Sequence, residues 1–260
     1  MFIAAAYQNQ FDPNAGAFIN ATGIAGLEAQ AVNQLVNNLK SAQLWGYMKA
    51  IYPMVGGTAF THKFNLVNPQ DTDAAFRLNF VGGWTHNSSG AKPDGVAGTY
   101  ANTFFAPSTQ FSTSNQHMSY YSFTNNAAAE DVEIGATDAG AAGECLIAFR
   151  FTGDLQYTFI GKGGGAGGAP GNSFGYMIAN RTTVCEGWKN GTRVVNTGAF
   201  VANTSRNLYL GAQNDGTVNT RNSTRGCSYA SMGFSMPSGD AVTLNNIVNN
   251  FQKTLGRNVF

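Results

Sequence analysis

The sequence predicts a mainly β chain in which one β-sandwich or jelly roll is flanked by an α-helix at each end. Three observations indicate this class. Apolar residues recur at helical spacing near both ends of the chain. Between them, short apolar runs alternate with turns rich in Gly, Asn, Pro and Asp. The dipeptide Asn190-Gly191 separates two β-forming runs, which is the strongest local signal for a two-residue hairpin.

The first helix is expected at roughly 24–43, after an aperiodic segment at the N-terminus. One apolar side chain recurs every four positions there: Leu27, Ala31, Leu35 and Leu39. An apolar cluster at 44–52 follows. It is either a docking surface or part of a helix packed on its own sandwich, and the second interpretation is favoured because such a stripe is costly to leave in water.

The strands are expected to be short and regularly spaced, as in a sandwich or jelly roll. Their candidate ranges are 60–67, 74–81, 102–106, 117–124, 131–137, 145–151, 155–161, 173–180, 184–189, 192–197, 207–212 and 227–235. A two-residue turn at Asn190-Gly191 would place Trp188 opposite Arg193, so that the guanidinium can lie on the indole face.

The second helix is expected to close the chain. Ser238 can cap its start, and Gly256 is placed to end it. One face is apolar, with residues spaced by three, one, three and four: Leu244, Ile247, Val248, Phe251 and Leu255. We expect both helices to pack beside the sandwich, with Leu35, Leu39, Ile247 and Phe251 mostly buried.

Composition excludes several classes of protein. With 43% hydrophobic residues the chain is not disordered, and with 11% charged residues and a net charge of +1 it has no field that favours nucleic acid. No apolar run is long enough to insert into a membrane. Cys145, Cys185 and Cys227 are interpreted as buried, reduced thiols on strands, although a disulfide between two of them stays open.

The motifs of cofactor and metal chemistry are absent. The glycine run at 162–171 has its lysine before the glycines and not after them, so it is interpreted as a mobile hairpin loop and not as a phosphate loop. His62, His86 and His117 are distant in sequence, and no Gly-x-Ser-x-Gly elbow is present. The sequence therefore predicts no catalytic residue and no cofactor.

One acidic segment resembles the start of a glycosidase motif. Glu130-Asp131-Val132-Glu133 would place Asp131 and Glu133 on one face of a strand. The third acid is missing, since Gly135 stands in its place, and two neighbours on one strand are not the opposed pair that glycoside hydrolysis uses. The segment is interpreted as the solvent-facing edge of a strand.

Two weak binding sites are candidates. Trp84 and His86 open a polar loop at 84–99 and could form a platform for a sugar ring, or Trp84 could be half-buried structural cover. Asn214 and Asp215 could add glycan contacts, or they could help to hold a Ca²⁺ ion at the rim of the sandwich. An ordinary turn is the simpler interpretation of this second pair.

Several blocks of the sequence resemble those of tailed-bacteriophage structural proteins that carry a concanavalin A-like or laminin G-like domain. They include Gly-Gly-Trp-Thr-His at 82–86 and Thr-Leu-Gly-Arg at 254–257, and the other blocks lie at 18–24, 48–53, 56–58, 61–66, 68–69, 73–78, 100–103 and 245–251. The resemblance implies a concanavalin A-like sandwich. It also implies a non-enzymatic virion protein, made in the host cytoplasm and displayed on the particle as a head fibre, decoration or tail appendage.

The same resemblance implies other virion proteins and further copies of the chain as partners, and a cell-surface glycan as a ligand. Residues 1–20 are expected to be an attachment arm, with Phe2, Tyr7 and Phe11 as partner contacts, and 21–260 to be the sandwich domain. Two other functions remain open: a depolymerase that cleaves glycans on the same fold, and a soluble lectin-like module.

Overall fold

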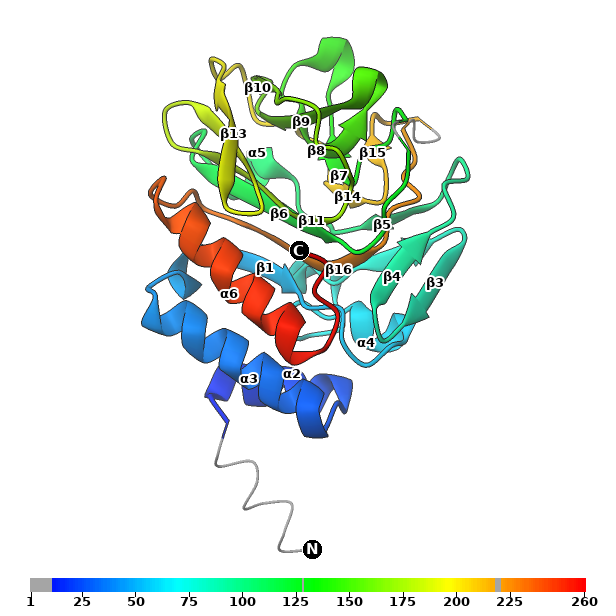
Figure 1. The fold of residues 1–260 in the computed structure, drawn as a ribbon, viewed down its shortest axis with the longest axis vertical. Helices are drawn as coiled ribbons and strands as arrows, with labels where there is room; N and C mark the ends of the chain where they lie inside the picture. Colours follow the sequence, from blue (N-terminus) through cyan, green and yellow to red (C-terminus); the bar gives the residue numbers. More distant parts are fainter. Residues whose placement is uncertain (1–10, 128, 218–220) are drawn as a thin grey trace, which may run out of the picture.

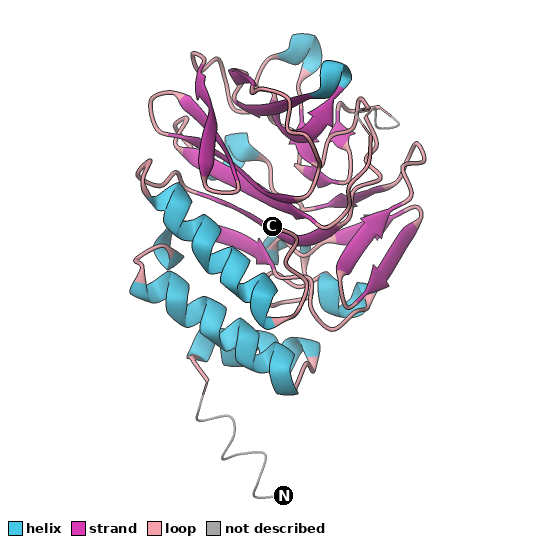
Figure 2. Cartoon of the chain, viewed as in Figure 1, coloured by secondary structure: helices cyan, strands magenta, loops and turns pink. Residues whose placement is uncertain are grey.

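The computed structural model describes residues 11–127, 129–217 and 221–260. Two eight-stranded sheets pack face to face, and helices form a third layer on the outer side of one sheet (Figures 1 and 2). Nearly all strand pairs are antiparallel; β15 (Gln213–Asn214) runs parallel to β7 (Ile134–Ala136). The expectation of a mainly β chain is therefore confirmed.

The first sheet lies next to the helices. Its strand β1 (Met48–Tyr52) pairs with β16 but stands outside the main strand order. The main order is β13 (Thr192–Thr197), β12 (Cys185–Lys189), β11 (Gly175–Arg181), β6 (Gln116–Ser122), β16 (Cys227–Gly233), β4 (Gly90–Pro93) and β3 (Trp84–Asn87).

In the second sheet, β15 pairs with β7 but stands outside the main strand order. The main order is β10 (Gly163–Ala166), β9 (Leu155–Ile160), β8 (Cys145–Phe151), β7, β14 (Tyr209–Leu210), β5 (Tyr100–Asn102) and β2 (Asn79–Val81).

Among the described residues, three helices are longer than one or two turns: α2 (Pro13–Thr22), α3 (Gly26–Ser41) and α6 (Asp240–Thr254). The shorter ones are α4 (Ala59–His62), α5 (Pro107–Gln110), η1 (Trp45–Tyr47), η2 (Asp73–Ala75), η3 (Ala139–Ala141) and η4 (Thr152–Asp154). No helix in the described part of the chain has the length and apolar character needed to cross a membrane.

The central strands of the first sheet are buried on both faces. Their side chains alternate as the pleat requires. Tyr121, Tyr176 and Tyr229 face the helices, whereas Met118 and Met177 point into the space between the sheets. This sheet therefore separates two hydrophobic cores, one under the helices and one inside the sandwich.

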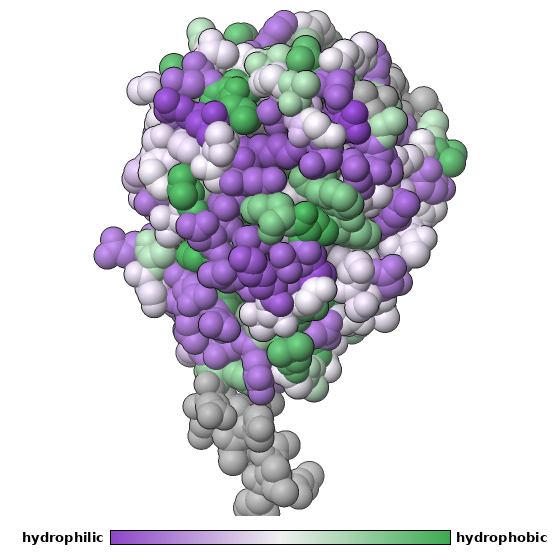
Figure 3. Space-filling model, viewed as in Figure 1, coloured by the Kyte–Doolittle hydropathy of each residue, from purple (hydrophilic) through white to green (hydrophobic). Residues whose placement is uncertain are grey.

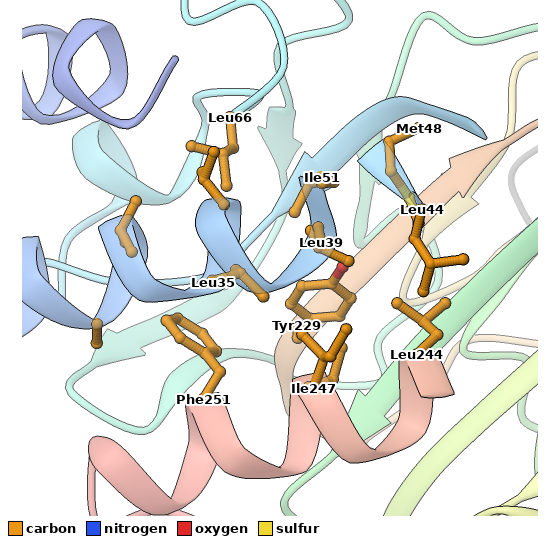
Figure 4. Packing of buried hydrophobic residues seen from close by; sticks show 14 of the residues in the cluster. Leu35, Leu39, Leu44, Met48, Ile51, Leu66, Tyr229, Leu244, Ile247 and Phe251 are labelled. Atoms are coloured by element: carbon orange, nitrogen blue, oxygen red, sulfur yellow. The ribbon is translucent and has the colours of Figure 1, made fainter. Parts of the chain in front are cut away.

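The helical stripes interlock as the sequence predicts, except that Leu27 of the α3 stripe is 56% exposed and takes no part in the core. Leu35 and Leu39 of α3 are 1% and 0% exposed, and Ile247 and Phe251 of α6 are 9% and 4% exposed. Figure 4 shows these side chains between the two helices, with Tyr229 of β16 between Leu39 and Ile247. Gly256 ends α6 with a positive φ of 67°. The N-cap is Gly239, while Ser238 instead donates to Glu186, so the predicted cap is wrong by one residue.

The predicted hairpin forms. Asn190 and Gly191 have φ values of 50° and 80°, as a type I′ turn requires. Trp188 pairs with Arg193, and the guanidinium lies 5.8 Å from the centre of the indole ring. Local turn chemistry is therefore sufficient to set this pairing.

Three other predicted segments are corrected. Residues 60–67 are not a strand, because Thr58 and Thr61 form a capping box that starts α4. The polar loop at 84–99 contains the β3–β4 hairpin. The glycine run at 162–171 is not simply a mobile loop, because its backbone pairs with β9 as strand β10. A ladder needs backbone groups and no side chain, so a glycine run can complete it.

The boundary expected at residue 20, between an attachment arm and the domain, is also corrected. The second half of that arm forms α2, whose Phe18 is fully buried in the core under the helices. Asp12 caps this helix and pairs with Lys40 at 2.7 Å, and Phe11 packs against the same core. The helix has only 10 residues, too few to show a clear period. Phe2 and Tyr7 lie outside the described residues.

The three cysteines are buried free thiols on β8, β12 and β16, as predicted. Burial raises the pKa of each thiol to about 12.

Large exposed hydrophobic side chains are dispersed, and the face in Figure 3 is largely hydrophilic with separate hydrophobic patches.

Candidate functional site

The strand β9 has its side chains turned the opposite way from its sequence pattern. In Leu155–Ile160 apolar and polar residues alternate, which would normally place the aromatic residues in the core. Instead Gln156 and Thr158 are buried, at 4% and 0% exposure, while Tyr157 and Phe159 are partly exposed. The amide oxygen of Gln156 and the hydroxyl of Thr158 have no hydrogen-bond partner. Large aromatic rings therefore lie on the outer face at the expense of buried polar groups.

These rings form a continuous aromatic strip on the second sheet. The rings of Tyr157 and Phe159 are nearly parallel, at 13°, with centroids 5.9 Å apart. Phe151 of β8 meets Tyr157 edge-on at 5.4 Å. Beneath them lies a small apolar cluster of Val132, Leu146 and Ala148. The rings are thus supported from below and open to solvent above.

The neighbouring strand leaves this strip uncovered. Gly164 of β10 lies opposite Phe159, and Ala166 lies opposite Tyr157. A larger side chain at Gly164 would not be tolerated, because its φ is 142° and a Cβ would collide with the carbonyl of Thr158. The glycine run therefore keeps the edge of the strip flat.

A groove crosses the strip and continues into a polar region. Its aromatic section, about 280 Å³, is lined by Phe151, Tyr157, Phe159 and four further residues. Its polar section, about 530 Å³, is lined by η3, by Gln213 of β15 and by residues of the nearby loops. The two sections share Ala141, Glu144 and Arg221, so they form one continuous groove, which we call the outer groove.

A chain of hydrogen bonds holds the junction between the two sections. Arg221 donates to the amide oxygen of Gln213 at 2.8 Å, and the Gln213 amide nitrogen donates to Glu144 at 2.8 Å. Arg221 also lies 3.5 Å from Glu144, and its guanidinium is 5.1 Å from the centre of the Phe151 ring. The polar groups at the junction are therefore held in place before any ligand arrives.

Glu130 is exposed, but Asp131 and Glu133 do not form a solvent-facing edge, which corrects the prediction. Glu133 is fully buried and pairs with the buried Arg225 at 2.8 Å. Asp131, on the same side as predicted, lies 3.4 Å from the same guanidinium. Burial raises the pKa of both carboxyl groups, and Arg225 acts in the opposite direction. Neither carboxylate lines the outer groove, so the pair is structural.

Trp84 and His86 belong to a different cluster. The Trp84 indole N–H donates to the carbonyls of Val81 and Tyr100, at 3.1 and 3.3 Å, and its ring stacks with that of His86. The Nδ1 atoms of His86 and buried His62 are 2.9 Å apart, so one of them donates to the other. The indole and imidazole edges are engaged within the protein, and neither residue lines the outer groove.

Asn214 and Asp215 lie beside the outer groove, but only Asp215 lines it. The Asn214 amide donates to the carbonyl of Asn207 and accepts from Gly216 N–H, which is the chemistry of a turn. Asp215 accepts from Thr217. Across the ranges that the structure describes, no three His, Cys, Asp or Glu side chains are grouped to hold a metal ion.

Of the residues that line the outer groove, only Asp215 is among the candidate binding residues of the sequence. The available signal was the pair Tyr157 and Phe159, two residues apart on a strand next to a glycine run. It was missed because the alternation of β9 assigns these rings to the core. Glu144, Gln213 and Arg221 are distant in sequence, so only folding brings them together.

Comparison with known proteins identifies no family. No model of a protein family matches the chain, and no curated protein matches it in sequence. Among solved structures it is similar to a mutant of Trypanosoma rangeli sialidase displaying trans-sialidase activity, with a TM-score of 0.48 and 9% identity. That match covers 87% of this chain and 39% of the sialidase chain.

A second similar structure is domain 4 of AbnA, a GH43 extracellular arabinanase from Geobacillus stearothermophilus, in complex with arabinotriose. The TM-score is 0.44 at 10% identity, covering 76% of this chain and 98% of that domain. Both neighbours come from carbohydrate-active enzymes, which contradicts the expectation of a non-enzymatic protein, and that expectation is withdrawn. Similarity at this level assigns no activity or substrate to this chain.

Proposed function

We propose that the protein binds a glycan in the outer groove. The observation that carries this proposal is the inverted strand β9, which exposes Tyr157 and Phe159 while it buries two polar side chains. Proteins break the local pattern in this way mainly where function requires it. An exposed aromatic strip beside carboxylate, amide and guanidinium groups offers stacking to the CH faces of a sugar and hydrogen bonds to its hydroxyls.

The setting we propose is the surface of a bacteriophage particle, with other virion proteins and further copies of this chain as partners. The support for it is the resemblance of the sequence blocks to phage structural proteins with a concanavalin A-like sandwich. On this proposal the two sheets belong to that finer fold class. Mass spectrometry of purified particles from the strain that encodes the chain is the test, and a particle without the protein would contradict it.

The glycan site is tested by removing its rings. Tyr157→Ala and Phe159→Ala should each weaken binding to a retained polysaccharide by at least about tenfold, or 1.4 kcal/mol, as measured by calorimetry after a glycan-array screen. The melting temperature should change little, because both rings lie outside the two main cores. Phe60→Ala, at a ring that is 55% exposed and outside the groove, is the matched control.

Two results decide the proposal. Equal binding by the Tyr157, Phe159 and Phe60 variants would place the ligand elsewhere and contradict it. Carboxylates such as Glu144 and Asp138 line the groove and could act on a bound glycan. Measuring reducing ends in the same mixtures distinguishes binding alone from cleavage of the glycan.

A further inference from the structure

We infer that the outer groove selects against acidic sugars and takes glycans that are neutral or carry amino groups. This inference rests on the proposed glycan binding and adds the class of ligand. It depends on the charges around the polar section, on how its arginine is engaged, and on the hydrogen-bonding character of its carboxylates.

Carboxylates dominate the polar section. Four carboxylates line it, whereas Arg221 is the single cation in its lining. The carboxylates belong to Glu130, Asp138, Glu144 and Asp215. Two more cations lie near but do not line it. Arg206 is 3.8 Å from Asp138, and Lys162 donates to the carbonyl of Gly140 at 3.5 Å. Carboxylates therefore outnumber cations even when both neighbours are counted.

The arginine in the groove is already engaged. Arg221 donates to Gln213 and lies beside Glu144, with its guanidinium over the Phe151 ring. Recognition of a sugar carboxylate normally uses a guanidinium that can offer two parallel N–H groups to it. Here Glu144 already compensates the positive charge of Arg221. The carboxylate of a uronic or sialic acid would therefore meet net repulsion from the carboxylates at the junction.

The same groups suit an uncharged sugar. An ionised carboxylate is an acceptor only, and sugar hydroxyls can donate to it. Glu130 is exposed, and Glu144 and Asp138 line the groove with side-chain exposures of 13% and 26%. Asp138 also accepts from Thr204 and Ser205, so Glu130 and Glu144 are the principal acceptors. A sugar stacked on Tyr157 and Phe159 would present the hydroxyls of its neighbour to these acceptors.

The test uses length-matched neutral, uronic-acid and amino-sugar oligosaccharides, with calorimetry at low and high salt. At low salt, neutral and amino-sugar ligands should bind at least about tenfold tighter than uronates of the same length. The difference should shrink at high salt, because screening weakens exposed charges. Uronates that bind as tightly as neutral sugars would overturn the inference but leave the proposed function standing. Failure of every glycan to bind would instead overturn the proposed function.

Charge variants test the cause. Glu130→Gln and Glu144→Gln should each raise uronate binding relative to neutral binding by about threefold, with folding checked by thermal melting. Asp73→Asn, which removes an exposed carboxylate outside the groove, should leave the ratio unchanged. An unchanged ratio in both glutamate variants would overturn the inference, because the selectivity would then not come from these carboxylates.

Discussion

Glu133 shows how a single residue can be assigned to the wrong environment when only its neighbours in sequence are considered. Its segment is acidic and appears solvated, yet the side chain is 0% exposed. Its partner Arg225 lies 92 positions further along the chain. Ser223 and the backbone N–H of Phe149 also donate to the carboxylate, so both of its oxygens are satisfied. Such a network holds the chain in one arrangement, and removal of one member leaves a buried charge.

Glu133→Gln should lower the free energy of unfolding by about 3 kcal/mol, because the buried charge of Arg225 would lose its closer counter-ion and keep only Asp131, at 3.4 Å. Denaturant unfolding followed by fluorescence measures this change. Glu130→Gln, on the same segment but exposed, is the control and should change stability by less than about 0.5 kcal/mol. Equal stabilities of the two variants would show that the Arg225 pair contributes nothing.

At the scale of elements, the β9–β10 pair shows that side-chain direction is decided by packing and not by local pattern. Gly187 of β12 leaves room for Thr158 inside the sandwich, since a Cβ there would meet the Thr158 side chain. The outer face of β9 then carries Tyr157 and Phe159, with the glycines of β10 beside them. The same glycine run that allows an uncovered aromatic strip also makes the strand hard to identify from sequence.

Two glycines of this run should respond differently to alanine. Gly164→Ala is expected to cost about 2 kcal/mol, because its φ of 142° and the close Thr158 carbonyl both oppose a Cβ. Gly168→Ala should be neutral or slightly stabilising, since no atom lies within 4 Å of the added carbon. Thermal melting compares them. A Gly164 variant as stable as the Gly168 variant would contradict the pairing of β10 with β9.

At the scale of the whole molecule, the helices determine which sheet face stays open to solvent. They cover the outer side of the first sheet and bury its central strands on both faces (Figure 1). The outer face of the second sheet has only a small apolar cluster and carries the outer groove. One face of the molecule is therefore buried in a core, and the other carries the groove in which we propose that a glycan binds.

Two buried histidines should make the whole molecule less stable in mild acid. Burial lowers the pKa of His117 from 6.5 to about 4, and that of His62 to about 3. Below pH 6.5 the unfolded chain binds protons that the folded chain does not, so the free energy of unfolding should fall as the pH falls. The slope is about 1.4 kcal/mol per pH unit for each histidine until the pH approaches the folded pKa.

The pH dependence is measured by urea unfolding between pH 6.5 and 5, where carboxyl groups with ordinary pKa values stay ionised. His117→Asn should reduce the slope by about 1.4 kcal/mol per pH unit, although it also lowers stability at pH 7 by removing the hydrogen bond to the Phe234 carbonyl. A slope identical to that of the unmodified protein would show that His117 is protonated in the folded state.

The sequence by itself determined the features that depend on neighbours a few residues apart. These are the apolar stripes of α3 and α6, the Asn190-Gly191 turn with Trp188 opposite Arg193, and most strands of the sandwich. Helical periodicity and turn chemistry are local, so a short window of sequence contains them.

Only the tertiary structure decided the face to which β9 turns its rings, the burial of Glu133, and the meeting of Glu144, Gln213 and Arg221. Each depends on partners far away in the chain. A strand can present either face to the core, and the choice is made by the space that other strands leave, as Gly187 does for Thr158. The groove is built from such choices, which is why the sequence predicted the sandwich but not its site.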